Sequence, residues 1–195
     1  GWRAPSGTEA VLLAEVEGET PAAARDAAQR LRRAFLGAGA FEVALALEPA
    51  AEEALWALRH AASPILARLD PSLKSMQFIE DGAVPPERLA AYVRGVRAAL
   101  ERQGIRGVIF GHAGDGHVHV NPLIDVRLAD WRARAAALLE EVTALVASLG
   151  GTLAGEHGDG RLRTPLLAAT WPTETRALFA AVKAACDPAG ILNPG

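Results

Sequence analysis

The sequence contains little cysteine and no long apolar run, and these absences exclude several classes of protein. A single cysteine, Cys186, rules out an internal disulfide and a four-cysteine zinc or iron-sulfur site within this chain, and it fits a reducing compartment. No apolar run reaches the roughly 18 residues that a membrane span requires, and no signal-peptide pattern is visible. We therefore expect a cytoplasmic protein without a transmembrane segment, attached to a membrane, if at all, peripherally through partners.

Basic residues are not clustered either. The net charge is -3 and no Lys/Arg cluster alternates with aromatic side chains, which argues against a nucleic-acid partner. By contrast, 50% of the 195 residues are hydrophobic, enough for one sizeable domain with its own core. The chain begins at Gly1 without a methionine and stops at Gly195, so we expect a domain separated from a longer protein.

Strand and helix patterns alternate along the chain. Thr20 and Pro21 are typical of a helix start, and Pro64 should interrupt or restart the second helix. The expected strands cover residues 9–17, 41–47, 74–79 and 107–110. The expected helices run from 21 to the glycines at 37 and 39, over 49–59, from 89 to the glycine at 104, over 128–149, and onward from about 162.

This order indicates an α+β fold, a ferredoxin-like antiparallel or mixed sheet with helices packed mainly on one face. No Gly-x-Gly-x-x-Gly motif lies between a strand and a helix, so no dinucleotide-binding half is visible in this chain.

Histidine is concentrated in two glycine-rich stretches. Four of the five histidines lie in residues 111–119 and 155–161. Histidine is a common ligand of borderline metals and the side chain that titrates nearest neutral pH. Isolated histidines are often only polar surface residues, but this clustering favours a metal or proton-transfer site.

The first stretch predicts a hairpin. Asp115 and Gly116 are a strong two-residue turn signal, which would pair His112 with His119 across the strands. Cross-strand Cβ atoms lie roughly 4.5 to 5.5 Å apart, so the two imidazoles could bind one ion at roughly 2.0 to 2.1 Å from each nitrogen.

Alternation along the second strand assigns the neighbouring side chains to faces. His117 and Asn121 should share the face of His119, whereas Val118 and Val120 should point into a core. Gly114 would then lie opposite His117 and leave room for a ring, a ligand or a substrate.

Glu156 and His157 could supply a third metal ligand and a proton-transfer group beside the two histidines. A catalytic zinc or manganese site often takes a carboxylate as third ligand and leaves a position for water or substrate. Adjacent residues of an extended chain point to opposite sides, so Glu156 can bind the ion while His157 moves protons. The glycines at 155, 158 and 160 allow the tight backbone path, or mark a plain turn before a helix.

Five motifs are specific when they are taken together. They are Trp56-Ala57-Leu58-Arg59, Glu80-Asp81-Gly82-Ala83-Val84-Pro85, Gly111-His112-Ala113-Gly114-Asp115-Gly116 with His119, Gly155-Glu156-His157-Gly158, and the ending from Asp187 to Gly195. With these motifs the chain resembles, over nearly its whole length, the C-terminal domain of FAD-linked oxidases of the D-lactate dehydrogenase, glycolate oxidase and D-2-hydroxyglutarate dehydrogenase group.

The resemblance implies a role for eight residues. It makes His112, His119 and Glu156 the ligands of a divalent metal, zinc or manganese, and His157 the general base. It makes Arg59, Ser63, Lys74 and Asn121 the substrate contacts. A 2-hydroxy acid needs its carboxylate clamped, for which arginine offers a bidentate fork and lysine a point charge.

Three positions depart from the family pattern. His117 stands where asparagine is usual, so a fourth imidazole could join the metal or touch the flavin. Ser63 replaces the more usual threonine. Asp159 stands where many members have an aliphatic residue, and in this departure the chain resembles longer relatives fused to iron-sulfur modules.

The resulting prediction is that residues 1–195 form the substrate- and metal-binding cap of a flavin-dependent D-2-hydroxy-acid dehydrogenase acting on a lactate, glycolate or 2-hydroxyglutarate type of substrate. Hydride would pass to FAD bound by an N-terminal domain absent from this chain, so the chain alone should be inactive. The expected partners are the 2-hydroxy acid substrate, that FAD-binding domain or subunit, and an electron acceptor or iron-sulfur protein. The sequence does not decide whether the protein forms a homo-oligomer. The alternatives are a self-contained divalent-metal hydrolase and a non-enzymatic ligand-binding or assembly module.

Overall fold

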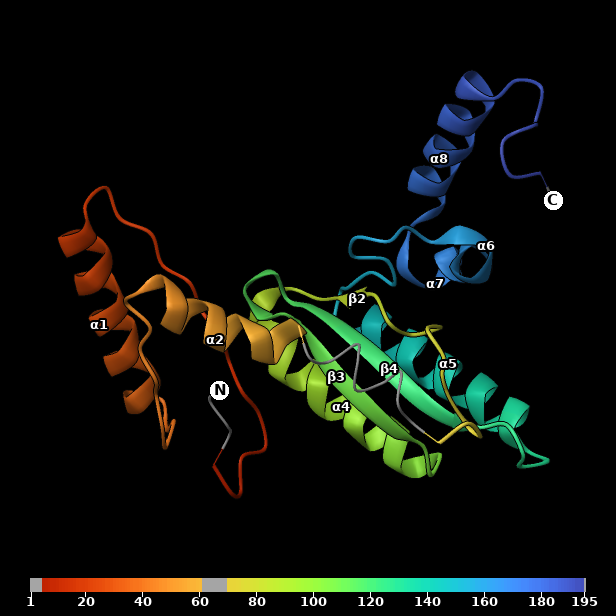
Figure 1. The fold of residues 1–195 in the computed structure, drawn as a ribbon. Coiled ribbons are helices and arrows are strands. Elements are labelled where there is room, and N and C mark those ends of the chain that lie inside the picture. The colour runs from red at the N-terminus through yellow and green to blue at the C-terminus, as the bar shows by residue number, and fades with distance from the viewer. Residues whose placement is uncertain (1–4, 61–69, 195) are drawn as a thin grey trace. The chain divides into compact units, whose positions relative to one another are not determined.

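The computed structural model describes residues 5–60 and 70–194, which belong to two compact units (Figure 1). One unit ends at residue 68 and the other begins at residue 69. Each unit is described by itself. Ser63 and Pro64 lie outside the described residues, so the predictions made for them concern positions that the structure does not describe.

In the first unit, the described residues form two helices, α1 (Pro21–Gly37) and α2 (Pro49–His60), as the sequence predicts. Thr20 caps α1, because its side chain accepts a hydrogen bond of 3.2 Å from the Ala23 N–H. The strands expected over 9–17 and 41–47 do not form, and those predictions were wrong. Leu12 is 65% exposed, and a strand needs a partner for its backbone hydrogen bonds, which neither run finds within this unit.

The second unit is built on a four-stranded antiparallel sheet. Its strands are β1 (Leu73–Ser75), β2 (Gly82–Ala83), β3 (Arg106–His112) and β4 (His117–Asp125). β4 pairs with all three others, and β1 and β2 share the edge opposite β3. The strand predicted over 74–79 is thus much shorter than expected.

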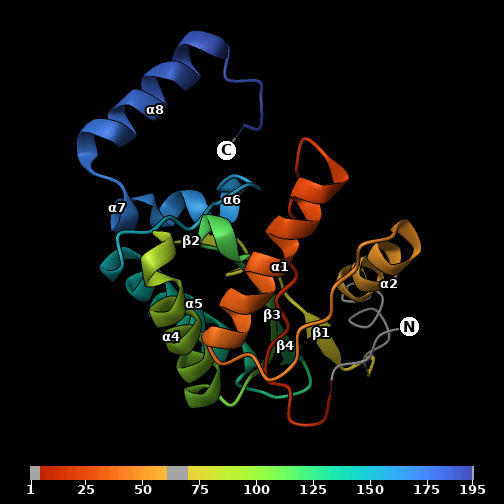
Figure 2. The ribbon, with the colours of Figure 1, turned by 90° about the vertical axis from the view of Figure 1, so that its left-hand side faces the viewer.

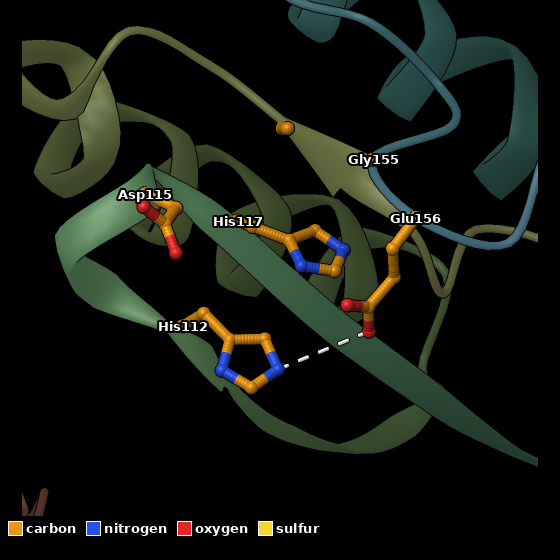
Figure 3. Close-up of a pocket in the computed structure, with 6 residues that line it drawn as sticks. His112, Asp115, His117, Gly155 and Glu156 are labelled. Atoms are coloured by element: carbon orange, nitrogen blue, oxygen red, sulfur yellow. Dashed lines mark ion pairs between the residues drawn. The ribbon is translucent and has the colours of Figure 1, made fainter.

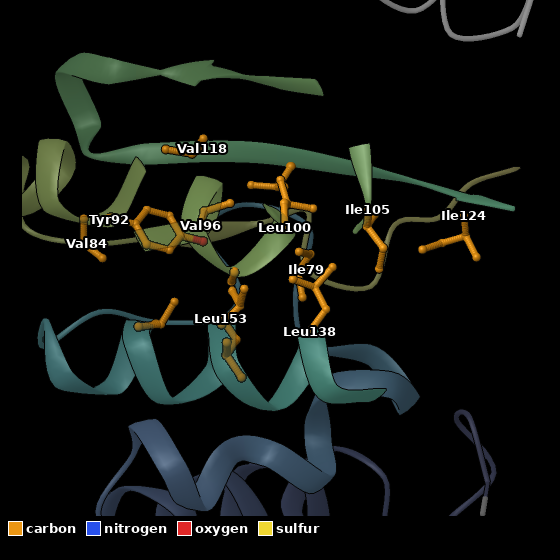
Figure 4. Close-up of a cluster of buried hydrophobic side chains, with 14 residues drawn as sticks. Ile79, Val84, Tyr92, Val96, Leu100, Ile105, Val118, Ile124, Leu138 and Leu153 are labelled. Atoms are coloured by element: carbon orange, nitrogen blue, oxygen red, sulfur yellow. The ribbon is translucent and has the colours of Figure 1, made fainter. Parts of the chain in front are cut away.

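Two long helices cover one face of this sheet (Figure 1). They are α4 (Leu89–Arg102), which follows a short 3-10 turn η1 (Pro86–Arg88), and α5 (Trp131–Ser148), and they pack side by side (Figure 2). Val118 and Val120 of β4 point toward these helices, as predicted, into a core with Tyr92, Val96 and Leu138 (Figure 4). The α+β class, the antiparallel sheet and the predicted helices here are confirmed.

The end of the chain is helical. The turn of α6 (Gly160–Arg163) begins close to the predicted residue 162, and it is followed by η3 (Thr164–Leu166), α7 (Leu167–Thr170) and α8 (Thr173–Cys186). Within the described ranges, every helix is too short or too polar to cross a membrane.

The hairpin register differs from the prediction. His112 pairs with His117, and His119 pairs with Phe110. The turn uses residues 113–116 rather than two residues, with a 3-10 segment η2 (Ala113–Asp115) closed by Gly116 at φ 66°. A type I′ turn needs positive φ at both central residues, and in this structure Asp115 does not adopt it.

Although the turn differs from the predicted one, the histidines lie on the predicted face of the hairpin. Changing the loop from two residues to four shifts the pairing by two residues, and side chains alternate with a period of two. His112, His117 and His119 therefore still lie on one face of the hairpin, opposite the helix-covered face. Gly114 does not lie opposite His117, because it belongs to the turn.

Candidate metal centre

The Glu156 carboxylate lies against the histidine face of the hairpin, where Figure 3 shows it beside the imidazole of His112. The Glu156 Oε1 atom lies 3.1 Å from His119 Nε2 and 3.8 Å from His112 Nε2. Ligands of a tetrahedral ion with bonds of about 2.05 Å are roughly 3.3 Å apart. These two separations are near those that one ion requires, and one donor atom from each of the three residues lies within 4.8 Å of the others. Their donor chemistry suits zinc or manganese.

A backbone contact at the ring nitrogen away from Glu156 orients the imidazole of His119. Its Nδ1 atom lies 3.1 Å from the carbonyl oxygen of Glu80, and the imidazole is buried. A histidine that donates Nδ1–H to a carbonyl keeps a lone pair on Nε2, the nitrogen that faces Glu156. This is the usual arrangement behind a metal-bound histidine.

His157 is held by the side chain of the same glutamate. Its Nδ1 atom lies 3.0 Å from both carboxylate oxygens of Glu80, while Nε2 faces Glu156 Oε1 at 3.5 Å. The hydrogen bond to Glu80 raises the pKa of His157 above its ordinary value of 6.5, against a smaller effect of burial. A carboxylate-bound histidine next to a metal ligand is suited to take up a proton.

Asp81 holds the backbone of this second motif. Its fully buried carboxylate accepts hydrogen bonds from the N–H groups of Glu156 (3.2 Å) and His157 (2.9 Å) and contacts His117 Nε2 at 2.9 Å. Burial opposes its ionisation, but these hydrogen bonds outweigh burial and lower the pKa of Asp81 below 3.8. Asp81 thus connects the β2 edge of the sheet to the Glu156 loop.

Arg163 neutralises the acidic pair behind the site. Its buried guanidinium lies 3.3 Å from Glu80 and 3.8 Å from Asp81, and it donates to the Gly158 carbonyl at 2.6 Å. Glu80, Asp81, His119 and His157 form a second group that could bind a metal ion. Arg163 already supplies a cation to this group, and we therefore treat His112, His119 and Glu156 as the candidate metal site.

A pocket of about 440 Å³ opens beside the site. It is lined by His112, Asp115, His117, Glu156, Ala83 and Gly155 (Figure 3). This volume is at the small end of ligand pockets and fits a small organic acid better than a dinucleotide.

Of the predicted substrate contacts in the second unit, only Asn121 lies on the histidine face of the sheet. Asn121 is 3% exposed, shares the face of His119, and has a buried Oδ1 atom without a hydrogen-bond partner among the described residues. Lys74 is exposed and pairs with Ile124, whose side chain packs on the helix side of the sheet, so the register places Lys74 on the face away from the histidines. Arg59 lies on α2 in the other unit, and its role stays a prediction.

Sequence reasoning gave no role to Glu80, Asp81 or Arg163. The first two belong to a motif that carried the family resemblance, and an adjacent acidic pair before a glycine was their only signal. Arg163 had none, because an arginine in a short helical turn ordinarily belongs to the solvated surface.

An imidazole and carboxylate donor set beside a carboxylate-bound histidine is typical of sites that combine a metal with proton transfer. Comparison with known proteins identifies the family. Residues 1–195 match the family of FAD linked oxidases, C-terminal domain, and the chain belongs to it.

Its relatives include three kinds of enzyme. The glycolate oxidase subunit GlcD of Escherichia coli (strain K12) is 35% identical over 191 residues, which are 98% of this chain and 37% of that protein. D-2-hydroxyglutarate dehydrogenase of the same strain is 38% identical over 76% of this chain and 14% of its own length. D-lactate dehydrogenase of Archaeoglobus fulgidus is 35% identical over 63% of this chain and 27% of its own length. The chain thus spans well under half of each relative.

Proposed function

We propose that this chain is the substrate- and metal-binding domain of an FAD-dependent enzyme that oxidises a D-2-hydroxy acid of the glycolate, lactate or 2-hydroxyglutarate type. The observation that carries the proposal is the convergence of His112, His119 and Glu156 on one point, with His157 beside them. The family and the names of its relatives support the substrate class.

Oxidation of a 2-hydroxy acid to a 2-oxo acid removes a hydride from C2 and a proton from the hydroxyl group. FAD, when it is bound by another domain, supplies the hydride acceptor. His112, His119 and Glu156 would hold a divalent metal, which would lower the pKa of a hydroxyl group bound to it. The imidazole of His157 is placed to take up the hydroxyl proton.

Glu80 gives His157 the orientation for this step. Its carboxylate accepts a hydrogen bond from Nδ1, so Nε2 is the nitrogen left to receive the proton. The ionised Glu80 also stabilises the imidazolium that forms, and Arg163 keeps the buried carboxylate compensated.

The substrate itself is clamped by charge and by hydrogen bonds. Asn121 lies on the same face of β4 as His119, and its buried Oδ1 atom has no hydrogen-bond partner among the described residues. This oxygen could accept a hydrogen bond from a hydroxyl or protonated group of the substrate. The family resemblance predicts Arg59 as a contact of the substrate carboxylate and Ser63 as a further substrate contact. It predicts Lys74 as well, but the register places Lys74 on the face of the sheet away from the histidines, so we do not assign Lys74 to this site.

The test measures flavin reduction in the flavoprotein that contains this domain. Under anaerobic conditions, a D-2-hydroxy acid should bleach the flavin absorbance, and the L enantiomer should not. His157→Gln should slow the bleaching by about 100-fold or more, as expected for loss of a general base. The matched control, His60→Asn, removes a histidine from α2 instead.

Two results would overturn the proposal. One is reduction of the flavin at the wild-type rate in the His157→Gln protein. The other is hydrolytic turnover by the chain without any flavin, which would favour the hydrolase alternative.

A further inference from the structure

His117 is the histidine for which the family pattern provides no role, and it is more deeply placed than His112. It begins β4, directly after the left-handed Gly116, and its side chain is only 6% exposed. It pairs with His112 in the sheet, so both rings stand on the same face. A buried imidazole needs partners for its nitrogens, and each nitrogen can be followed separately.

One nitrogen is committed to a carboxylate. His117 Nε2 lies 2.9 Å from Asp81 Oδ1. An ionised carboxylate only accepts hydrogen bonds, so Nε2 carries the hydrogen and donates it. In the neutral imidazole the other nitrogen, Nδ1, then holds a lone pair. A carboxylate behind one ring nitrogen is the support that metal-binding histidines commonly have.

The His117 ring lies among the proposed ligands. One donor atom from each of His112, His117, His119 and Glu156 fits within 4.8 Å of one another. The His117 ring stacks on that of His112 with centroids 5.7 Å apart and meets that of His119 edge-on at 4.6 Å. Figure 3 shows the His117 ring between Gly155 and His112, against the pocket.

The chain also leaves space for this ring. A Cβ atom on Gly155 would lie 2.6 Å from His117 Cδ2, which is closer than side chains tolerate. Any larger residue at 155 would push the imidazole away or displace the loop that carries Glu156. Gly155 thus fills the role that sequence reasoning gave to Gly114.

We propose that His117 is a fourth protein ligand of the metal, binding through Nδ1 while Asp81 holds Nε2. The proposal rests on the proposed metal site of His112, His119 and Glu156. Three imidazoles and one carboxylate form a softer donor set than two imidazoles and one carboxylate, so the site should favour zinc over manganese.

The experiment counts imidazoles on zinc bound to the 195-residue chain. X-ray absorption at the zinc edge should show three imidazole ligands in the wild type and two in His117→Asn, which carries the residue usual in the family. Competition with a chelator should show that His117→Asn binds zinc at least about 10-fold more weakly. His60→Asn removes a histidine of α2 that is not among the proposed ligands, and it should match the wild type in both measurements.

The outcomes separate this proposal from the one it rests on. Two imidazoles on wild-type zinc, or zinc affinity unchanged in a folded His117→Asn chain, would overturn the role of His117 and leave the three-ligand site standing. A wild-type chain that binds no zinc and no manganese would overturn both. The count on the wild type needs no variant, so it decides even if His117→Asn fails to fold.

Discussion

Arg163→Met tests whether the buried ion pair behind the site supports the fold. The substitution keeps much of the side-chain length but removes the cation from Glu80. The Arg163 and Glu80 side chains are 10% and 9% exposed, so water cannot replace the lost partner. The carbonyl groups of Leu153 and Gly158 lose a donor as well.

The expected cost is large. Removing one member of a buried ion pair destabilises a protein by about 3 to 5 kcal/mol, because an uncompensated charge stays buried. For a unit of this size, each kcal/mol lowers the melting temperature by about 3 to 5 °C, so Arg163→Met should melt at least about 10 °C below the wild type. Adding Glu80→Gln should recover part of this loss, since it removes the stranded charge.

Arg102→Met is the matched control. Its ion pair with Glu141 is shorter, 2.6 Å against 3.3 Å, but the Arg102 side chain is 61% exposed. Exposed pairs contribute about 0 to 1 kcal/mol, so this variant should melt near the wild type. The stability of both variants is measured by thermal and denaturant unfolding, monitored by circular dichroism. Equal stability of the two variants, or no recovery in the double variant, would refute the reasoning from burial.

Two further predictions concern titration. Because Glu80 raises the pKa of His157, Glu80→Gln should lower the midpoint of the His157 NMR titration in the metal-free chain, and an unchanged midpoint would contradict the Glu80 contact. The hydrogen bond from Lys183, with backbone N–H groups of Ile191 and Leu192, lowers the pKa of Asp187 below 3.8. A lowered folded-state pKa contributes stability above the unfolded value that is lost as the pH falls through the folded value. The protection of amides in residues 187–192, corrected for intrinsic exchange rates, should therefore fall below about pH 4 in the wild type and should already be low at neutral pH in Asp187→Asn. Equal protection in both proteins would contradict the role of the hydrogen bonds to Asp187.

The faces of the hairpin could be predicted from the sequence, whereas its turn could not. Alternation in β4 placed His117, His119 and Asn121 together because a period of two does not depend on loop length. The turn depends on the φ angle of Asp115, which residue type alone leaves open. Strand patterns in 9–17 and 41–47 failed for a related reason, since a strand forms only where a partner is available.

The support behind the site was invisible in the sequence because it is made by long-range contacts. Glu80 and Asp81 look like a charged surface turn, yet both are buried. Their burial is compensated by Arg163, His117 and His157, which lie 36 to 83 positions further along the chain. Residue chemistry was enough to propose candidate ligands, and these stay predictions, whereas the residues that orient them could not be predicted.

Metal binding by the wild-type chain tests the central claim most directly. Titration with zinc or manganese, followed by calorimetry and elemental analysis, should show one divalent ion per chain. His119→Ala should abolish that binding, because it removes the imidazole 3.1 Å from Glu156, while His60→Asn should leave it unchanged. A wild-type chain that takes up no ion, or a His119→Ala chain that binds as tightly as the wild type, would contradict the account.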